Sequence, residues 1–170
     1  YNKVIEELYI RMDGLVGRTM AKLKEDDVFI VLSDHGFKPF KRGINLNTWL
    51  LREGYLALKP GKTESGEYFR DVDWSKTKAY AFGLAGIYLN VKGREKNGIV
   101  DPGTAQQQLK NELIDKLSGL TDPASGEVAI TALYDNRKIY KGPYAESGPD
   151  LIAGYNYGYR ISWHGGTGVI

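Results

Sequence analysis

Two stretches of the chain place apolar residues at the spacing of a helix. Residues 2–24 carry them three and four positions apart, and residues 102–120 do the same with Leu109, Leu113, Leu117 and Leu120. Because an α-helix has 3.6 residues per turn, each stretch lays an apolar stripe along one face. Pro102 stands near the start of the second stretch, where a helix tolerates proline. The sequence therefore predicts two amphipathic helices, each packed on a sheet.

Other stretches have the pattern of strands. Residues 28–32 are five consecutive apolar residues, which indicates a strand buried on both faces. Clean alternation over residues 151–163 indicates a half-buried strand, with Arg160 on its polar face. Tyrosines beside an arginine also suit single-stranded nucleic acid, but the half-buried strand is the simpler interpretation. Shorter apolar runs predict further strands in residues 55–58, 77–91 (broken at 83–86) and 128–134.

The order of the elements predicts the fold class. Residues 2–32 form a helix, a tight loop and a buried strand, which is half of a βαβ unit, so its partner strand is expected before residue 1. Asn45 or Asn47 can cap a short helix that runs to Glu53. We expect an α/β protein with a mixed, mostly parallel sheet flanked by helices.

Composition narrows the function classes. The 170 residues are 42% hydrophobic and 26% charged, which is typical of a globular domain with a core. A net charge of +2 is too small to argue for a nucleic-acid partner. No apolar run approaches the roughly 20 residues of a membrane span. The absence of cysteine excludes disulfides and thiolate metal sites.

The candidate chemistry lies where the apolar run 28–32 ends, in Ser-Asp-His-Gly. The carboxyl ends of strands are where open α/β sheets bind ligands. Asp34 and His35 would point to opposite faces of a regular strand, and they converge only if the chain leaves the pleat, which Gly36 permits. Both side chains are ordinary ligands for zinc-like cations. An Asp-His pair before glycine also occurs in turns that bind nothing.

The sequence that follows resembles a known family. The runs SDHGFKPFKRGINLNTWLLREGYLALK, AYAFGLAGIYLNVKGREKNGIV and GPYAESGPDLIAGYNYGYRISW are similar, in this order, to the type I phosphodiesterase/nucleotide pyrophosphatase branch of the alkaline phosphatase superfamily. The resemblance implies that Asp34 and His35 bind one of two divalent metal ions, with zinc favoured over manganese or iron. It implies hydrolysis of a small phosphate ester or nucleotide by a Thr or Ser nucleophile.

The resemblance also implies that part of the catalytic machinery lies elsewhere. The chain begins at Tyr1 without methionine and stops at Ile170, so we expect residues 1–170 to be part of one alkaline-phosphatase-like catalytic domain. The nucleophile and further ligands are expected before Tyr1, and a final metal-binding histidine after Ile170. We therefore expect an active full-length enzyme, and an inactive piece that is held together by the remaining segments of the parent chain or by self-association. The alternative is a degenerate family member or fragment that serves as a structural or interaction module.

Three further groups of residues are weaker candidates for the site. Lys41 and Arg42 lie in a cationic loop, and one of them can face a phosphate, although a solvated loop explains them more simply. His164 is the other histidine, but its surroundings resemble a segment upstream of the family's final Gly-Asp-His element, so we do not expect it on the metal. Asp71 and Asp73 lack a third ligand nearby and are expected in a turn or at a helix cap instead of on a metal.

Overall fold

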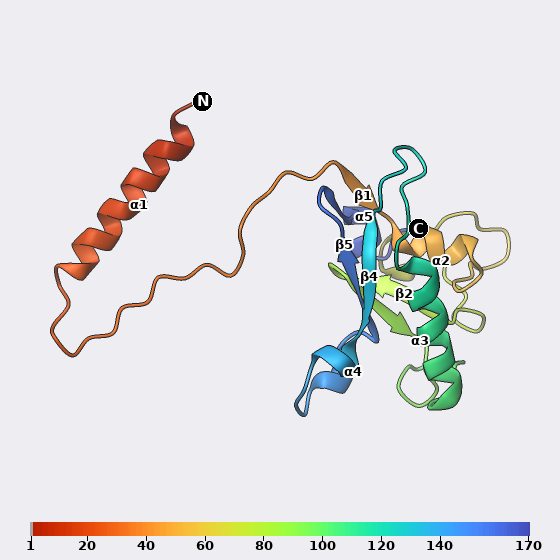
Figure 1. The fold of residues 1–170 in the computed structure, drawn as a ribbon. Coiled ribbons are helices and arrows are strands. Elements are labelled where there is room, and N and C mark those ends of the chain that lie inside the picture. Colours follow the sequence, from red (N-terminus) through yellow and green to blue (C-terminus); the bar gives the residue numbers. More distant parts are fainter. Residues whose placement is uncertain (1) are drawn as a thin grey trace. The chain divides into compact units, whose positions relative to one another are not determined.

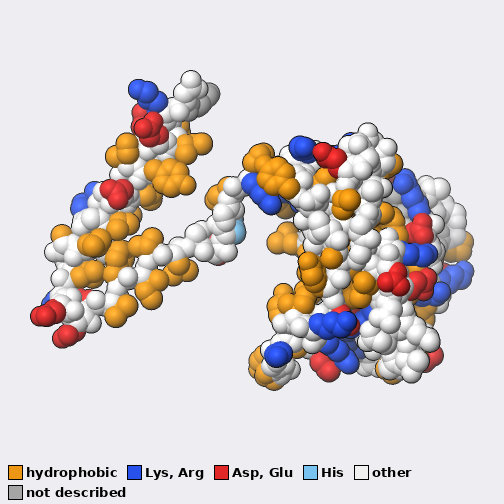
Figure 2. All heavy atoms as spheres, in the orientation of Figure 1, with side chains coloured by type: hydrophobic (Ala, Val, Ile, Leu, Met, Phe, Trp, Pro, Cys, Tyr) orange, Lys and Arg blue, Asp and Glu red, His pale blue; other side chains and the backbone are white. Residues whose placement is uncertain are grey.

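The computed structural model describes residues 2–170, which divide into two units, Tyr1–Phe37 and Lys38–Ile170. The first unit contains one helix, α1 (Val4–Met20), which confirms the helix predicted within residues 2–24. None of its residues is buried, and Figure 2 shows apolar side chains exposed along it. The packing of its apolar stripe on a sheet therefore stays a prediction.

The prediction of a buried strand at residues 28–32 is wrong for the described chain. These residues do not form a strand, and each of them is between 38% and 85% exposed. A buried strand needs backbone partners for its N–H and C=O groups, and the first unit supplies none. The chain there is drawn as the irregular trace that follows α1 in Figure 1.

The second unit contains two sheets. Strands β1 (Arg42–Ile44) and β6 (Tyr159–Ile161) form a parallel pair. The larger sheet has the antiparallel order β2-β3-β5-β4, made of Ala79–Phe82, Gly86–Leu89, Leu151–Tyr155 and Ile130–Asp135. The mixed α/β class is confirmed. Among the named strands of residues 2–170 only β1 and β6 pair in parallel, because the apolar run expected at the centre of a parallel sheet has no strand neighbours.

Helices cover the larger sheet and supply much of the core. Helix α3 (Thr104–Leu117) packs on β4 and buries Leu109, Leu113 and Leu117, which confirms the helix predicted from its leucine stripe. Helix α2 (Leu46–Arg52) contacts β2 and buries Leu46 and Leu50. Figure 1 shows α3 running alongside the sheet. Short helices complete the unit: η1 (Glu67–Phe69), α4 (Asn136–Ile139), η2 (Ala145–Ser147) and α5 (Trp163–Gly166).

Helix α2 begins and ends as its sequence predicts. The Asn45 side chain accepts hydrogen bonds from the amides of Asn47 and Thr48, and Gly54 has φ +77° just beyond the helix. The next four residues are not a strand, contrary to the prediction for 55–58. The amides of Tyr55 and Leu56 both donate to the Leu50 carbonyl. The start of this segment therefore satisfies the C-terminal end of α2 instead of pairing with a strand.

The alternating segment 151–163 is two strands and not one. Strand β5 ends at Tyr155, and β6 begins at Tyr159 in the other sheet. Between them Asn156 Oδ1 accepts from the Tyr157 amide, and Gly158 has φ +85°. An asparagine that bonds its following amide and a left-handed glycine make a turn. Within the described chain no helix is both long and apolar enough to cross a bilayer.

Candidate active site

Asp34 and His35 approach each other at the end of the apolar run. A bend at Asp34 takes the chain out of an extended path, and the Asp34 Oδ1 accepts the His35 amide at 3.1 Å. The His35 Nε2 and Asp34 Oδ2 atoms then lie 3.7 Å apart. Two donors on one tetrahedral zinc ion, each about 2.0–2.1 Å from it, are about 3.3 Å apart. The pair therefore needs only a small closure to share one cation.

The surroundings of His35 favour the metal-binding tautomer. Its Nδ1 lies 3.0 Å from the Gly36 carbonyl oxygen, which can only accept, so Nδ1 carries the proton in this arrangement. In the neutral imidazole the lone pair is then on Nε2, the atom that faces Asp34. Metal-binding histidines are commonly oriented in this way through their second ring nitrogen. Phe37 packs edge-on against the imidazole, with ring centroids 5.1 Å apart.

The pair is open to solvent and incomplete as a metal site. The side chains of His35 and Asp34 are 62% and 87% exposed. Among residues 2–170 no cluster of three or more histidine, aspartate or glutamate side chains is arranged to hold a metal ion. The donor types and spacing of Asp34 and His35 are compatible with two ligands of one metal ion, and the described residues place no third ligand beside them.

Lys41 and Arg42 are both engaged with carboxylates of the second unit. Arg42 Nε lies 3.0 Å from Oδ2 of Asp122, a buried carboxylate, and Lys41 Nζ lies 3.9 Å from the exposed Glu127. The hydrogen bond from the Ala124 amide, together with the Arg42 charge, holds the pKa of Asp122 below its usual value. Arg42 therefore has a structural role as the ion-pair partner of Asp122, whereas the ion pair of Lys41 with Glu127 is long and exposed.

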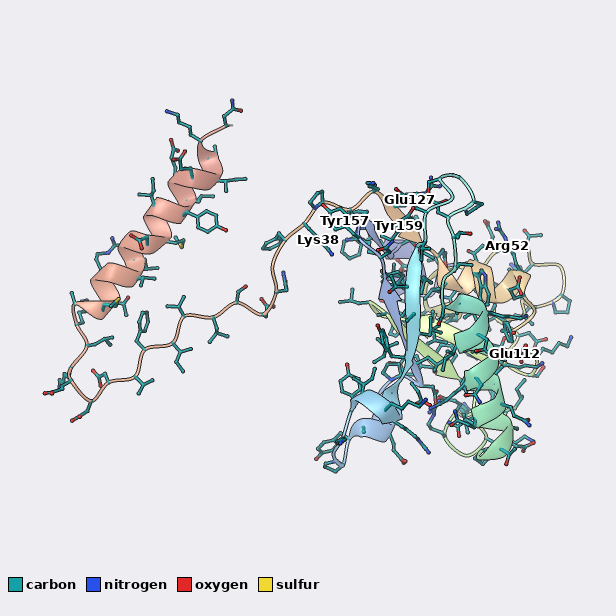
Figure 3. The ribbon with its side chains drawn as sticks, in the orientation of Figure 1. Lys38, Arg52, Glu112, Glu127, Tyr157 and Tyr159 are labelled. Atoms are coloured by element: carbon teal, nitrogen blue, oxygen red, sulfur yellow. The ribbon has the colours of Figure 1, made fainter. Side chains whose placement is uncertain are left out.

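Tyr159 joins the two carboxylates into one cluster. Its hydroxyl lies 3.2 Å from both Asp122 Oδ2 and Glu127 Oε2. Figure 3 shows Tyr159 and Glu127 at the end of the second unit where Lys38 and Tyr157 also lie. The Lys38 ammonium is 5.1 Å from the centre of the Tyr157 ring. This end of the unit thus gathers cations, carboxylates and tyrosines from segments far apart in the sequence.

Arg160 is a cation that the sequence did not single out as a site residue. Its guanidinium carbon lies 4.2 Å from the Phe40 ring centre and 3.9 Å from that of Trp163. Cation–π stacking on two rings holds it in place. The alternation of residues 151–163 placed Arg160 on the polar face of a strand, but pairing with Phe40 depends on a contact that periodicity does not encode.

The remaining candidates have local roles. His164 is exposed in α5, and its carbonyl accepts from the Thr167 and Val169 amides. Its absence from the metal stays a prediction. The Asp73 carboxylate accepts from the Ser75 amide and hydroxyl, and the Ser75 hydroxyl bond is the main reason that the Asp73 pKa is lowered. Asp73 therefore stabilises a turn, as expected.

Comparison with known proteins identifies the family. The model of the family "Type I phosphodiesterase / nucleotide pyrophosphatase" matches residues 2–166. The chain belongs to this family. Searches of curated proteins and of solved structures give no match. The type I phosphodiesterase/nucleotide pyrophosphatase family consists of hydrolases that are generally metal-dependent, and the match includes the Asp34-His35 pair as well as both sheets.

Proposed function

We propose that the full-length protein is a metal-dependent phosphodiesterase or nucleotide pyrophosphatase in which Asp34 and His35 bind one of two divalent ions. The observation that carries this proposal is the approach of Asp34 Oδ2 and His35 Nε2 to 3.7 Å, inside the family match. Zinc suits an imidazole and a carboxylate together, and manganese or iron also accept both. The nucleophile, a Thr or Ser, lies outside residues 1–170 in this proposal.

The roles of the two side chains follow from their chemistry. A bound pair of divalent ions stabilises charge on the attacking and leaving oxygens of a phosphoryl transfer. Asp34 contributes a negative charge to the site, and His35 contributes a neutral donor whose direction is set by the Gly36 carbonyl. Both side chains are exposed to solvent, so in this proposal the remaining ligands of the full-length protein complete the metal site around them.

Two exposed donors bind a divalent ion weakly, since catalytic zinc sites usually have three protein ligands. Residues 1–170 by themselves should therefore hold no tight metal and hydrolyse no phosphate ester. The substrate in this proposal is a small phosphodiester or a nucleotide, and its identity depends on residues beyond these.

The test is hydrolysis of bis(p-nitrophenyl) phosphate by the full-length protein with added zinc or manganese. Asp34→Asn and His35→Ala should each lower kcat/KM by about a hundredfold or more, the scale of losing support for a bound metal. His164→Ala is the matched control and should stay within about twofold of the parent, because His164 makes only local contacts. An inactive parent protein would support the structural-module alternative, and an active His35→Ala variant would remove His35 from the site.

A further inference from the structure

Arg160 is held on two aromatic rings that are open to solvent. Its guanidinium carbon lies 4.2 Å from the centre of the Phe40 ring and 3.9 Å from that of the Trp163 ring. Phe40 and Trp163 are themselves 51% and 71% exposed. Stacking on aromatic rings restricts a side chain that otherwise has many rotamers, so the position of this guanidinium is set before any ligand arrives.

The guanidinium keeps hydrogen-bond donors that no protein group uses. Its Nε donates to the Ile161 carbonyl at 3.2 Å, and its two terminal nitrogens have no acceptor among residues 2–170. The one buried side-chain nitrogen or oxygen without a partner in that range is Tyr155 Oη, so the terminal nitrogens of Arg160 reach solvent. These two nitrogens carry four N–H groups in a planar fork, which matches two oxygens of one carboxylate or phosphate.

A second cation of the same surface is also held on a ring. The Lys38 ammonium lies 5.1 Å from the centre of the Tyr157 ring, and Figure 3 shows these two side chains at one end of the second unit. Lys38 is two residues before Phe40, and its ring partner is three residues before Arg160. Lys38 and Arg160, the two ring-bound cations, therefore belong to the same pair of segments. An aromatic ring carries no net charge, so each cation keeps its own charge.

The two cations beside them are matched by carboxylates. Arg42 lies 3.0 Å from Asp122, and Lys41 lies 3.9 Å from Glu127. Among residues 2–170 the two ring-bound cations have no carboxylate oxygen within 4.0 Å. The two ion pairs cancel, so these six groups together carry two net positive charges, which are those of the ring-bound cations.

The stacking has a structural consequence as well, because Arg160 fastens residues 38–41 to β6 through it. This segment is also attached by its backbone, since the amides of Lys41 and Arg42 both donate to the Gly158 carbonyl, at 2.6 and 3.1 Å. Attachment alone requires neither an open fork of donors nor an uncancelled charge. Both features suit the binding of an anion.

We propose that Arg160 binds the phosphate group of a small phosphate monoester, with Lys38 as the second cation. The two terminal nitrogens of Arg160 meet two phosphate oxygens, the geometry in which arginine binds phosphate most strongly. Two net positive charges match a monoester, which carries nearly two negative charges at pH 7, better than they match a carboxylate or a diester with one. The proposal does not depend on the metal site or on hydrolysis.

The test is a fluorine-19 NMR titration of the full-length protein labelled with 5-fluorotryptophan. The Trp163 resonance, which a Trp163→Phe variant assigns, reports on the ring beside Arg160. Phenylphosphonate at pH 8.5 stands for the monoester because its C–P bond resists hydrolysis, and benzoate is the matched anion with one charge. Phenylphosphonate should shift this resonance with a Kd about tenfold lower than that of benzoate, both with and without EDTA.

Three outcomes of this titration would overturn the proposal. Equal Kd values for the two anions would leave only a general attraction of negative charge. A Trp163 shift that disappears in EDTA would place the phosphonate on metal ions, which belongs to the proposed hydrolytic site. A shift with an oligothymidylate but none with phenylphosphonate would replace the small ligand by single-stranded nucleic acid.

Three variants locate the interaction. Arg160→Lys keeps the charge but removes the fork, so it should weaken phenylphosphonate about tenfold. Arg52→Lys makes the same exchange in α2, apart from Lys38 and Tyr157 in Figure 3, and should leave the Kd unchanged. Lys38→Gln leaves Arg160 on its two rings and should weaken phenylphosphonate several-fold while changing benzoate less. Equal Kd values for Arg160→Lys and Arg52→Lys, or an unchanged Kd for Lys38→Gln, would show that the proposed site is wrong.

Discussion

Replacing Lys110 with methionine should lower the free energy of unfolding of the second unit by about 3–5 kcal/mol, the cost of leaving one charge of a buried pair without its partner. Lys110 Nζ lies 2.9 Å from Asp135 Oδ1, and the two side chains are 2% and 4% exposed. The pair ties α3 to the end of β4. The measurement is urea denaturation of the chain, followed by far-UV circular dichroism.

The same helix provides a control. Lys116→Met removes an ammonium that is 44% exposed and 3.2 Å from Glu53, and a surface pair of this kind contributes about 0–1 kcal/mol. Asp135→Asn in the Lys110→Met background removes the orphaned charge but keeps an oxygen for the Arg137 amide, so it should recover about half the loss or more. Equal losses for Lys110→Met and Lys116→Met would refute the reasoning.

The same pair predicts a dependence on pH. Burial by itself raises the pKa of Asp135, but the hydrogen bonds from Lys110 and from the Arg137 amide outweigh it and hold this pKa below its usual value. The unfolded chain, with an ordinary aspartate pKa of about 3.9, then binds more protons than the folded chain as the pH falls. The stability that the pair supplies is present above that pH and is lost below it. The Lys110→Met/Asp135→Asn variant should lose less stability between about pH 5 and pH 2 than the parent.

Two further predictions concern Gly168 and Tyr80, which both lie against the Phe69 ring. Gly168→Ala should lower the free energy of unfolding by about 2–3 kcal/mol in urea denaturation, because φ is +80° and the new Cβ would meet the Phe69 ring. Gly61→Ala is the control: φ is +77° but the new Cβ has open space, so the loss should be about 1 kcal/mol. Equal losses in the two variants would contradict the contact with Phe69. In an ultraviolet titration the Tyr80 hydroxyl should ionise near its pKa of about 12. This pKa is raised above the unfolded value of about 10, so the contribution of neutral Tyr80 to the free energy of unfolding is lost as the pH rises above about 10. A Tyr80→Phe variant that leaves the late-ionising absorbance unchanged would show that Tyr80 titrates normally.

Local sequence signals predicted the elements whose partners are close in the chain. The leucine stripe of α3 and the Asn45 cap of α2 each depend on contacts within a few turns, so periodicity and capping rules found them. The apolar run 28–32 was predicted as a buried strand, but a strand exists only beside another strand, and none pairs with it in the first unit. The alternation of residues 151–163 extends across a turn, because Tyr157 falls in step with the apolar positions of the strands. The turn itself depends on the left-handed conformation of Gly158, which the alternation does not reveal.

The candidate site likewise contains residues that local sequence identifies and residues that only the folded structure brings together. The Asp34-His35 pair could be found from sequence because adjacent residues and a following glycine carry the signal. The stacking of Arg160 between Phe40 and Trp163 joins residues more than a hundred positions apart. The rings of Phe69, Trp74 and Tyr80, which pack edge-to-face on one another, likewise come from η1, β2 and the segment between them. No spacing rule links such residues, so their roles became visible only in the folded chain.

The most direct test of the central claim is the metal content of the full-length protein, measured by inductively coupled plasma mass spectrometry after dialysis against zinc-free buffer. The parent and His164→Ala should each retain about two ions per chain, as a two-metal site requires. His35→Ala should retain about one, since it removes a ligand from one ion and leaves the other. Two retained ions in His35→Ala, at the occupancy of the parent, would contradict the assignment of Asp34 and His35 to a metal.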